Sequence, residues 1–277
     1  MHRLTRTVRL HINPAGTELG SPPRSGNTYA GFPTPVGFAA FCEVEVGVAG
    51  EPDPVTGYVL DIRVIDGATR RVLLPALNEA YRASPPVDVG RWLCEHAPAL
   101  AAALPRPLRS LRLRLTPLLS YEVHMPPTAT TLTTPTTVLL RQRFDFAASH
   151  RLHVPTMTDE ENRALFGKCN NVHGHGHNYQ IEPCVAISIS SGGSGISVGQ
   201  LEEVCSRVIL ARFDHKHLNE DTQEFNLARG GVNPSVENIA RVFHDLLAPE
   251  VARTPGAHLR SITVWETDRT CATYPAA

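Results

Sequence analysis

The segment FGKCNNVHGHGHNY, residues 166–179, places alternating histidines and glycines directly before an apolar run that is typical of a β-strand. Residues two apart in an extended chain point to the same face, so His175 and His177 can aim both imidazoles at one point. The glycines between them allow the backbone to come close to a neighbouring group. The segment therefore predicts the start of a strand that carries a pair of metal-binding side chains.

A third imidazole is expected from the strand before this segment. In residues 138–150, His150 shares the parity of apolar side chains such as Phe146 and therefore faces the same way. If this strand pairs antiparallel with the later one, three histidines meet near the strand ends. Three imidazoles with a fourth position left open are typical of a catalytic zinc ion. We therefore predict a zinc site formed by His150, His175 and His177.

Length and composition set the class of protein. The chain has 277 residues, of which 42% are hydrophobic and 19% charged, so it can bury a core. A net charge of −1 predicts no binding to nucleic acid or to an anionic membrane. No run approaches the roughly 18 apolar residues of a membrane-spanning helix. Six scattered cysteines without a Cys-x-x-Cys pair favour a reducing compartment, so we expect a cytoplasmic protein.

The chain divides at one segment rich in proline and threonine, residues 125–137. Nothing in this segment is periodic, as is typical of a linker. We therefore predict a first domain over residues 1–124 and a second domain over residues 138–277.

The two halves resemble each other. Each has two strands, helical stretches and a closing pair of strands, and the first closing strands read LRSLRLRLT (108–116) and LRSITVWET (259–267). This order predicts an internal duplication of a strand–strand–helix–helix–strand–strand unit, although two unrelated domains could share such alternation. The expected fold class is α+β, and each unit is an antiparallel four-stranded sheet with two helices on one face. Ser197 with Gln200 fits a capping box, and Ser235 beside Pro234 fits a helix N-cap.

Cys169 lies in a loop rich in glycine and asparagine, six residues before His175. One interpretation is a small buried hydrophobe, the common fate of a free cysteine. The loop setting and the neighbouring Lys168 favour a catalytic thiolate instead, because positive charge stabilises the reactive form.

Two further positions carry candidate chemistry. Asp214 and His215 can form a proton relay, or they can belong to an ordinary polar loop between helices. Glu266 shares a strand face with Ile262 and Val264, where the pattern calls for an apolar residue. A buried carboxylate without a partner is unfavourable, so Glu266 is expected to meet a ligand such as the donor edge of a heterocycle.

These motifs together resemble the 6-pyruvoyl-tetrahydropterin synthase family. The resemblance runs in family order through the whole second half, over residues 146–152, 166–179, 214–216, 234–240 and 265–267. It implies the tunnelling (T-)fold, in which antiparallel sheets backed by helices assemble into barrels as homo-oligomers. The first half has no His-x-His or Asp-His motif and carries Leu115 at the place of Glu266, so we expect a degenerate, non-catalytic T-fold copy there.

The resemblance also implies roles for the site residues. Zinc would be held by the three histidines, Cys169 would act as general base, and Asp214 with His215 would relay a proton. Glu266 would anchor the pterin ring. Ser235 would contact the substrate, although the family more often has two hydroxyl residues where this chain has Ser235-Val236. The implied substrate is 7,8-dihydroneopterin triphosphate, which loses triphosphate to form 6-pyruvoyl-tetrahydropterin, a step of tetrahydrobiopterin biosynthesis that needs no nicotinamide or flavin.

Two other functions remain open from the sequence. 6-Carboxytetrahydropterin synthase shares the fold, zinc ligands and substrate implied by the resemblance, but its cysteine-to-histidine loop is usually shorter than the five residues between Cys169 and His175 here. The second is a zinc-stabilised scaffold that has no catalytic activity. Such a scaffold would not need Cys169, Asp214, His215 or Glu266, so the presence of all four argues against it.

Overall fold

The computed structural model describes residues 1–13, 31–126, 134–189 and 195–276. They form two compact units: the described parts of Met1–Leu140 and Ile187–Ser194 make the first, and those of Arg141–Ala186 and Gly195–Ala277 make the second. Most of the expected linker, residues 127–133, lies outside the described residues, and the domain boundaries stay a prediction. No described helix has the length and apolar character needed to cross a membrane.

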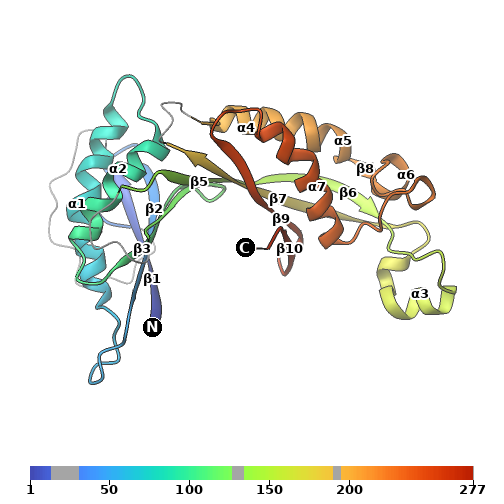
Figure 1. The fold of residues 1–277 in the computed structure, drawn as a ribbon, viewed down its shortest axis with the longest axis horizontal. Coiled ribbons are helices and arrows are strands. Elements are labelled where there is room, and N and C mark those ends of the chain that lie inside the picture. The colour runs from blue at the N-terminus through green and yellow to red at the C-terminus, as the bar shows by residue number, and fades with distance from the viewer. Residues whose placement is uncertain (14–30, 127–133, 190–194, 277) are drawn as a thin grey trace. The chain divides into compact units, whose positions relative to one another are not determined.

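The first unit contains four antiparallel strands, β1 to β4, and two helices (Figure 1), and β5 (Thr137–Gln142) pairs with β4. Its strands pair in the order β1-β2-β3-β4. In chain order its elements are β1 (His2–Ile12), β2 (Ala40–Gly50), α1 (Ile62–Arg82), α2 (Val89–Ala102), β3 (Leu108–Thr116) and β4 (Leu119–His124). Asp61 and Asp88 start the helices as N-caps, each accepting a hydrogen bond from a backbone N–H of the first turn.

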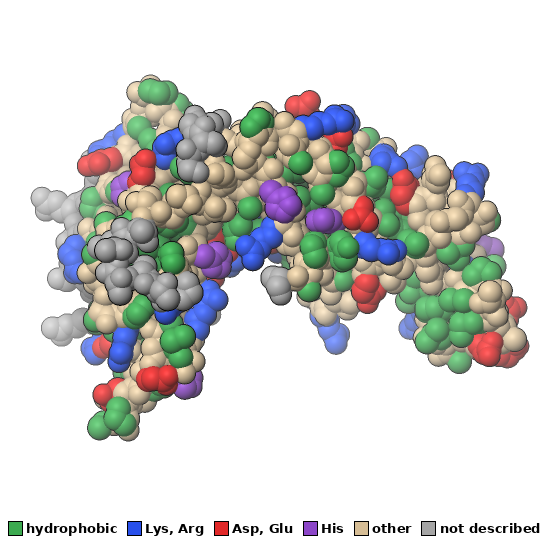
Figure 2. Space-filling model, in the orientation of Figure 1, with side chains coloured by type: hydrophobic (Ala, Val, Ile, Leu, Met, Phe, Trp, Pro, Cys, Tyr) green, Lys and Arg blue, Asp and Glu red, His purple; other side chains and the backbone are tan. Residues whose placement is uncertain are grey.

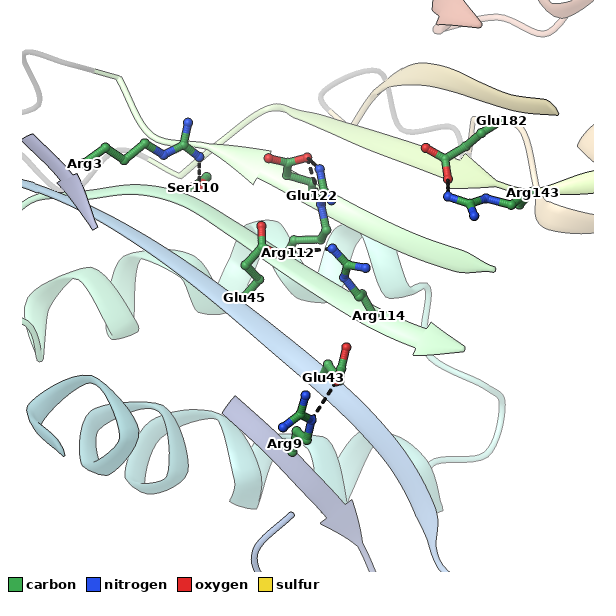
Figure 3. Close-up of polar contacts among 10 residues, drawn as sticks. All are labelled: Arg3, Arg9, Glu43, Glu45, Ser110, Arg112, Arg114, Glu122, Arg143 and Glu182. Carbon is green, nitrogen blue, oxygen red and sulfur yellow. Dashed lines mark hydrogen bonds and ion pairs between the residues drawn. The ribbon is translucent and has the colours of Figure 1, made fainter. Parts of the chain in front are cut away.

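Apolar and charged residues alternate along these strands, so the two faces of the sheet differ. Val8, Val44 and Leu111 are fully buried on the face that packs on the helices. The other face carries cross-strand pairs (Figure 3), including Arg9 Nε to Glu43 Oε1 at 2.9 Å and Arg112 to Glu122 at 2.7 Å. One apolar and one polar face are expected of an antiparallel sheet with helices on a single side.

The second unit repeats this order with additions. Its central strands are β6 (Phe144–His150), β7 (His175–Ser188), β9 (Ala257–Thr267) and β10 (Thr270–Tyr274). They pair as β6-β7-β9-β10, with the two-residue strand β8 (Lys216–His217) parallel to β6 at the outer edge. The strand expected over residues 138–150 is broken at Arg143, because β5 (Thr137–Gln142) ends before β6 begins.

In the second unit, α4, α5 and α7 lie along one face of the strands, and α3 lies beyond the strand ends (Figure 1). The described helical segments are α3 (Asp159–Phe166), η1 (Gly167–Asn170), α4 (Val198–Cys205), η2 (Ser206–Leu210), α5 (Ala211–Phe213), α6 (Leu218–Asp221), η3 (Leu227–Arg229) and α7 (Val236–Val251). Ile239, Phe243 and Leu247 of α7 are completely buried, as the three- and four-residue spacing predicts. The expected capping box of Ser197 with Gln200 is confirmed.

The two units share the strand order that the expected duplication predicts, and the duplication itself stays a prediction. In each unit the first strand pairs with the second, the second with the third and the third with the fourth. Both helices of the first unit, and α4 to α7 of the second, come between the second and third of these strands, whereas α3 comes between the first and second. The α+β class and the antiparallel sheet backed by helices are therefore correct.

Candidate active site

The register of β6 and β7 brings the three histidines together. His150 lies opposite His175, and Ala148 lies opposite His177, in an antiparallel pair. Because alternate residues share a face, all three imidazoles lie on the side of the sheet that also carries Phe146 and Tyr179. His150 is 1% exposed, and the other two are half-buried.

Glu266, near the end of β9, joins this cluster. Its Oε1 lies 3.3 Å from Nε2 of His150 and 3.0 Å from Nε2 of His177. The Nε2 atoms of His150 and His175 are 3.1 Å apart. One ligand atom from each of the four residues lies within 4.8 Å of the others, the one such group of at least three His, Cys, Asp or Glu among the described residues. The sequence associated Glu266 with a heterocycle and did not predict its approach to the imidazoles.

The hydrogen bonds of the cluster fit a metal ion. Nδ1 of His150 lies 2.7 Å from the carbonyl oxygen of Pro234, which can only accept, so the ring carries its proton at Nδ1 and the neutral form offers the Nε2 lone pair. Nε2 of His177 is buried and makes no hydrogen bond, although Oε1 of Glu266 is 3.0 Å away. Nitrogen and oxygen atoms that converge this closely, with Nε2 of His177 left without a hydrogen bond, are arranged as metal ligands are.

Electrostatics favour the ligand forms of these groups. Burial, followed by the neighbouring imidazoles, lowers the pKa of His175, and burial also lowers the pKa of His177. The hydrogen bond with His150 lowers the pKa of Glu266, against the opposing effect of burial. Neutral imidazoles and an ionised carboxylate are the states in which these side chains bind a divalent cation.

Cys169 approaches the cluster from the segment that includes α3. Thr158 and Glu161 form a capping box at the start of α3, and Gly167, with φ of +54°, ends the helix and leads into η1. The carbonyl oxygen of Cys169 accepts a 2.8 Å hydrogen bond from the N–H of Leu152, which attaches this turn just beyond the end of β6. No helix was expected over α3, although the Thr158-x-x-Glu161 signal of a capping box is present in the sequence.

The acidity of Cys169 corrects one expectation. Lys168 was expected to favour the thiolate. Instead, partial burial and then the negative charge of Glu266 raise the pKa of the Cys169 thiol. The positive charge of the exposed Lys168 does not offset these two effects, so the thiol form is favoured over the thiolate.

Asp214 and His215 form a pair at the edge of the sheet. Oδ1 of Asp214 accepts a 2.9 Å hydrogen bond from the N–H of Ala147 and lies 2.9 Å from Nδ1 of His215. The N–H of His215 donates back to the carbonyl oxygen of Ala147 at 2.6 Å, and His215 adopts a φ of +56°. The Ala147 hydrogen bond lowers the pKa of Asp214. The His215 ring is 82% exposed, so the pair presents an oriented imidazole to solvent.

This pair borders a depression beside β6 and β7. A cavity of about 420 Å³ is lined by Ala147, Ala148 and Ser149 of β6, by Gly176, His177 and Asn178 of β7, and by His215, Lys216 and His217. His177 of the cluster and His215 therefore border the same cavity, although His215 is not one of the four residues that form the cluster.

Ser235 is confirmed as the N-cap of α7, where its side chain accepts a 3.4 Å hydrogen bond from the N–H of Asn238. The adjoining Pro234 carbonyl, which orients His150, was missed because main-chain carbonyls leave no sequence signal. Tyr179 was also missed as a neighbour of the site. Its buried hydroxyl lies 3.4 Å from Nδ1 of His150, and its ring stacks on Phe146 at 4.9 Å. Its shared parity with His177 was the available signal.

Comparison with known proteins identifies the relatives of this arrangement. The family model described as 6-pyruvoyl tetrahydropterin synthase matches residues 139–277, half of the chain. The chain belongs to this family. All the candidate site residues described above fall inside the matched region.

Individual relatives in the family cover the same part of the chain. The 6-pyruvoyl tetrahydrobiopterin synthase of Homo sapiens is 36% identical over 134 residues, which are 48% of this chain and 88% of the human protein. The Drosophila melanogaster protein of the same name is 46% identical over 87 residues, 31% of this chain, and the match spans only about half, 52%, of that protein. The solved structure of 6-pyruvoyl tetrahydropterin synthase from Caenorhabditis elegans is 28% identical, with a TM-score of 0.43 over 51% of this chain and 96% of that one.

Proposed function

We propose that the second half of the chain is a zinc-dependent 6-pyruvoyl-tetrahydropterin synthase, which converts 7,8-dihydroneopterin triphosphate to 6-pyruvoyl-tetrahydropterin with elimination of triphosphate. The observation that carries the proposal is the convergence of three imidazoles and one carboxylate within 4.8 Å, close to a cysteine, in a member of this family. The substrate and the reaction are assigned by analogy with the relatives, which are named as 6-pyruvoyl tetrahydrobiopterin synthases.

His150, His175 and His177 would hold the zinc ion. Their Nε2 atoms are directed to one place, and the Pro234 carbonyl keeps His150 in the ligating tautomer. When bound, zinc would supply Lewis-acid chemistry, making protons next to the substrate's side-chain oxygens easier to remove.

Cys169 would take a proton from the substrate side chain. Its turn is fixed beside the end of β6 by the Leu152 hydrogen bond, and its charge interacts with Glu266 of the cluster. A thiol whose pKa is raised is a stronger base once it is ionised, which suits abstraction of a carbon-bound proton.

Asp214 and His215 would move a second proton. The carboxylate next to Nδ1 orients the ring, which leaves Nε2 as the exchanging atom. The lowered pKa of Asp214 keeps this carboxylate ionised at neutral pH.

The proton relay would serve the cluster of a second copy of the chain. Asp214 and His215 are not among the four residues that form the cluster of their own chain. Apolar side chains gather on the surface over α3 (Figure 2), and Leu165 and Val172, on either side of Cys169, are 62% and 66% exposed. Exposed apolar residues beside an incomplete site are typical of a surface that a partner covers. A homo-oligomer would complete the site.

Glu266 would hold the pterin ring, and Ser235 would stand near the substrate at the start of α7. A carboxylate can accept two hydrogen bonds from neighbouring N–H donors of a heterocycle, which gives orientation rather than bond-making. The half-buried position of Glu266 at the cluster would bring that ring beside the metal.

The first unit would be a non-catalytic copy of the fold. Its described residues include no group of His, Cys, Asp and Glu side chains comparable with the cluster. Leu115 of β3 stands at the strand position that corresponds to Glu266 of β9.

The deciding experiment is a product assay with purified, zinc-loaded full chain and 7,8-dihydroneopterin triphosphate. We expect one equivalent of triphosphate released per 6-pyruvoyl-tetrahydropterin formed. A carboxylated pterin with acetaldehyde would identify a 6-carboxytetrahydropterin synthase instead. Absence of triphosphate release from protein that retains zinc would favour a non-catalytic scaffold.

A further inference from the structure

The two ends of the excursion that carries Cys169 lie side by side. Residues 151–174 leave the cluster after His150 and return to it at His175, with Cys169 on the returning side. The N–H of Leu152 donates a 2.8 Å hydrogen bond to the carbonyl oxygen of Cys169. The turn that holds the proposed base is therefore attached to the first residues that follow a proposed zinc ligand.

Asn170 closes this attachment with its side chain. It is 7% exposed, and its Nδ2 lies 2.7 Å from the carbonyl oxygen of Leu152 and 3.2 Å from Nδ1 of His153. A side-chain amide has two N–H donors, so Nδ2 can serve both acceptors at once. Nε of Arg151 donates in turn to the carbonyl oxygen of Asn170 at 3.3 Å. The turn at Cys169 is thus bonded to three consecutive residues.

Residues 151–153 are themselves fixed to the sheet. The N–H of Arg151 donates to Oδ1 of Asn219 at 2.8 Å, and Nδ2 of Asn219 donates back to the carbonyl oxygen of Arg151 at 3.0 Å. Asn219 lies 68 residues after Arg151, the same separation at which Lys216 of β8 pairs with Ala148 of β6. The amide of Asn219 therefore continues the ladder between these strands after the main chain has turned into α6.

The same residues reach the start of α7. The N–H of His153 donates to Oδ1 of Asn233 at 3.3 Å, and the next residue, Pro234, accepts from Nδ1 of His150. Hydrogen bonds from several segments leave residues 151–153 little freedom to move, so a group attached to them keeps its place relative to His150.

We infer that Asn170 is a positioning residue for the proposed reaction, because it joins the turn of Cys169 to the rigid segment that follows His150. The inference rests on the proposed function for the role of Cys169 as base. A base must lie within hydrogen-bond reach of the proton it removes, and a displacement of about 1 Å can lower the rate about 100-fold. Asn170 would fix that distance without touching the substrate.

Asn162 provides the matched comparison within the same excursion. It is completely buried, and its side chain bonds with main-chain groups of residues 154–158. None of these hydrogen bonds involves residues 151–153 or the turn at Cys169. Loss of the Asn162 amide should therefore destabilise the excursion without releasing Cys169.

The test compares Asn170→Ala with Asn162→Ala in the zinc-loaded full chain. We expect Asn170→Ala to lower kcat at least about tenfold, with KM within about twofold and zinc stoichiometry unchanged, because substrate binding and the metal ligands stay intact. Asn162→Ala should lower the midpoint of chemical denaturation at least as far and change kcat by less than about threefold. Wild-type kcat in Asn170→Ala, or an equal loss of kcat in both variants, would overturn the inference.

Thiol reactivity gives a readout that needs no turnover. Alkylation of Cys169 by iodoacetamide is followed by peptide mass spectrometry relative to Cys271, which is exposed on β10. Asn170→Ala should raise the ratio of the two rates at least about threefold, since the half-buried thiol is released, and Asn162→Ala should leave the ratio unchanged. An unchanged ratio in Asn170→Ala would also overturn the inference. A raised ratio in a protein whose wild type has no turnover would remove the proposed function and leave the attachment of Cys169 by Asn170 standing.

A milder variant keeps the inference testable if Asn170→Ala does not fold. His153→Ala removes one of the two acceptors of the Asn170 amide and leaves the Leu152 carbonyl oxygen in place. We expect kcat to fall about two- to fivefold, and the double variant to be no slower than Asn170→Ala alone, because both changes break one contact. Unchanged kcat in His153→Ala, or fully additive losses in the double variant, would contradict this coupling.

Discussion

His150 donates its Nδ1 proton to the main-chain carbonyl oxygen of Pro234 across 2.7 Å. This hydrogen bond links the end of β6 to the residue before the N-cap of α7. Because it settles which nitrogen carries the proton, it directs the free lone pair of His150 toward His175, His177 and Glu266. The metal-binding capacity of the cluster therefore depends on a loop about 85 residues further along the chain.

Removing a histidine and removing the cysteine should have different effects. His177→Ala should lose bound zinc, because two imidazoles remain where three are needed. Cys169→Ala should retain zinc at the wild-type stoichiometry and lose turnover, because it removes only the base. Metal analysis after dialysis, with turnover measured on the same samples, checks both. Zinc at full occupancy in His177→Ala would contradict the assigned ligands.

Gly174→Ala should destabilise the second unit by about 1–3 kcal/mol. Gly174 has φ of +70°, and an added Cβ would lie 2.6 Å from Nε2 of His217 and 2.9 Å from the carbonyl oxygen of His150. Shifting these groups should also reduce zinc affinity. Chemical denaturation and zinc competition measure the two effects.

The matched control for this substitution is Gly199→Ala. Gly199 lies in α4, has no positive φ, and has nothing within 4 Å of an added Cβ. It should be neutral or stabilising by up to about 1 kcal/mol. Equal destabilisation by both alanines would show that space at Gly174 is not the cause.

Glu266→Gln should keep zinc and lose substrate affinity. The amide cannot replace an ionised acceptor for ring N–H groups, and hydrogen bonds to charged groups contribute about 1.5–3 kcal/mol. The expected fall in kcat/KM is thus about 10- to 150-fold, mainly through KM. Because Oε1 approaches two imidazoles within 3.3 Å, a parallel metal titration is informative. A large loss of zinc affinity with unchanged KM would make Glu266 a metal ligand instead of the pterin anchor.

Asp214 should contribute to acid sensitivity. The Ala147 N–H, opposed by burial and assisted by His215, lowers its folded-state pKa. A depressed carboxylate pKa contributes stability above the unfolded value of about 3.9, and that contribution disappears as pH falls through the folded value. The unfolding free energy of wild type should therefore exceed that of Asp214→Asn at neutral pH, and the difference should shrink below about pH 4. A difference independent of pH would exclude this origin.

Mixed oligomers should recover activity from two inactive variants. If the relay serves a second copy, co-assembly of Cys169→Ala with His215→Gln forms some sites that have both an intact cysteine and an intact histidine. Turnover of the co-expressed, tag-selected mixture should exceed that of either variant alone. Assembly without any recovered turnover would place both residues of a working site on one chain.

Much of the site followed from period-two alternation. In an extended chain, local stereochemistry sets which face a side chain occupies, so the common face of His150, His175 and His177 was predictable once the strands were assigned. The capping box at Ser197 and the N-cap at Ser235 were predictable for the same reason, because each depends only on residues close in sequence. The missed α3 had the same kind of signal in Thr158 and Glu161.

Tertiary structure alone decided what came near those histidines. Glu266 joins the cluster because β9 pairs with β7, and the Pro234 carbonyl joins it because of where α7 begins. Asp214 with His215 lies at the edge of β6 because β8 pairs there. Sequence periodicity determines direction within one segment, whereas the approach of segments far apart in the chain depends on pairing and packing of the whole unit. For the same reason the pKa of Cys169 is raised by partial burial and then by Glu266, nearly a hundred residues away in sequence, and not lowered by its neighbour Lys168.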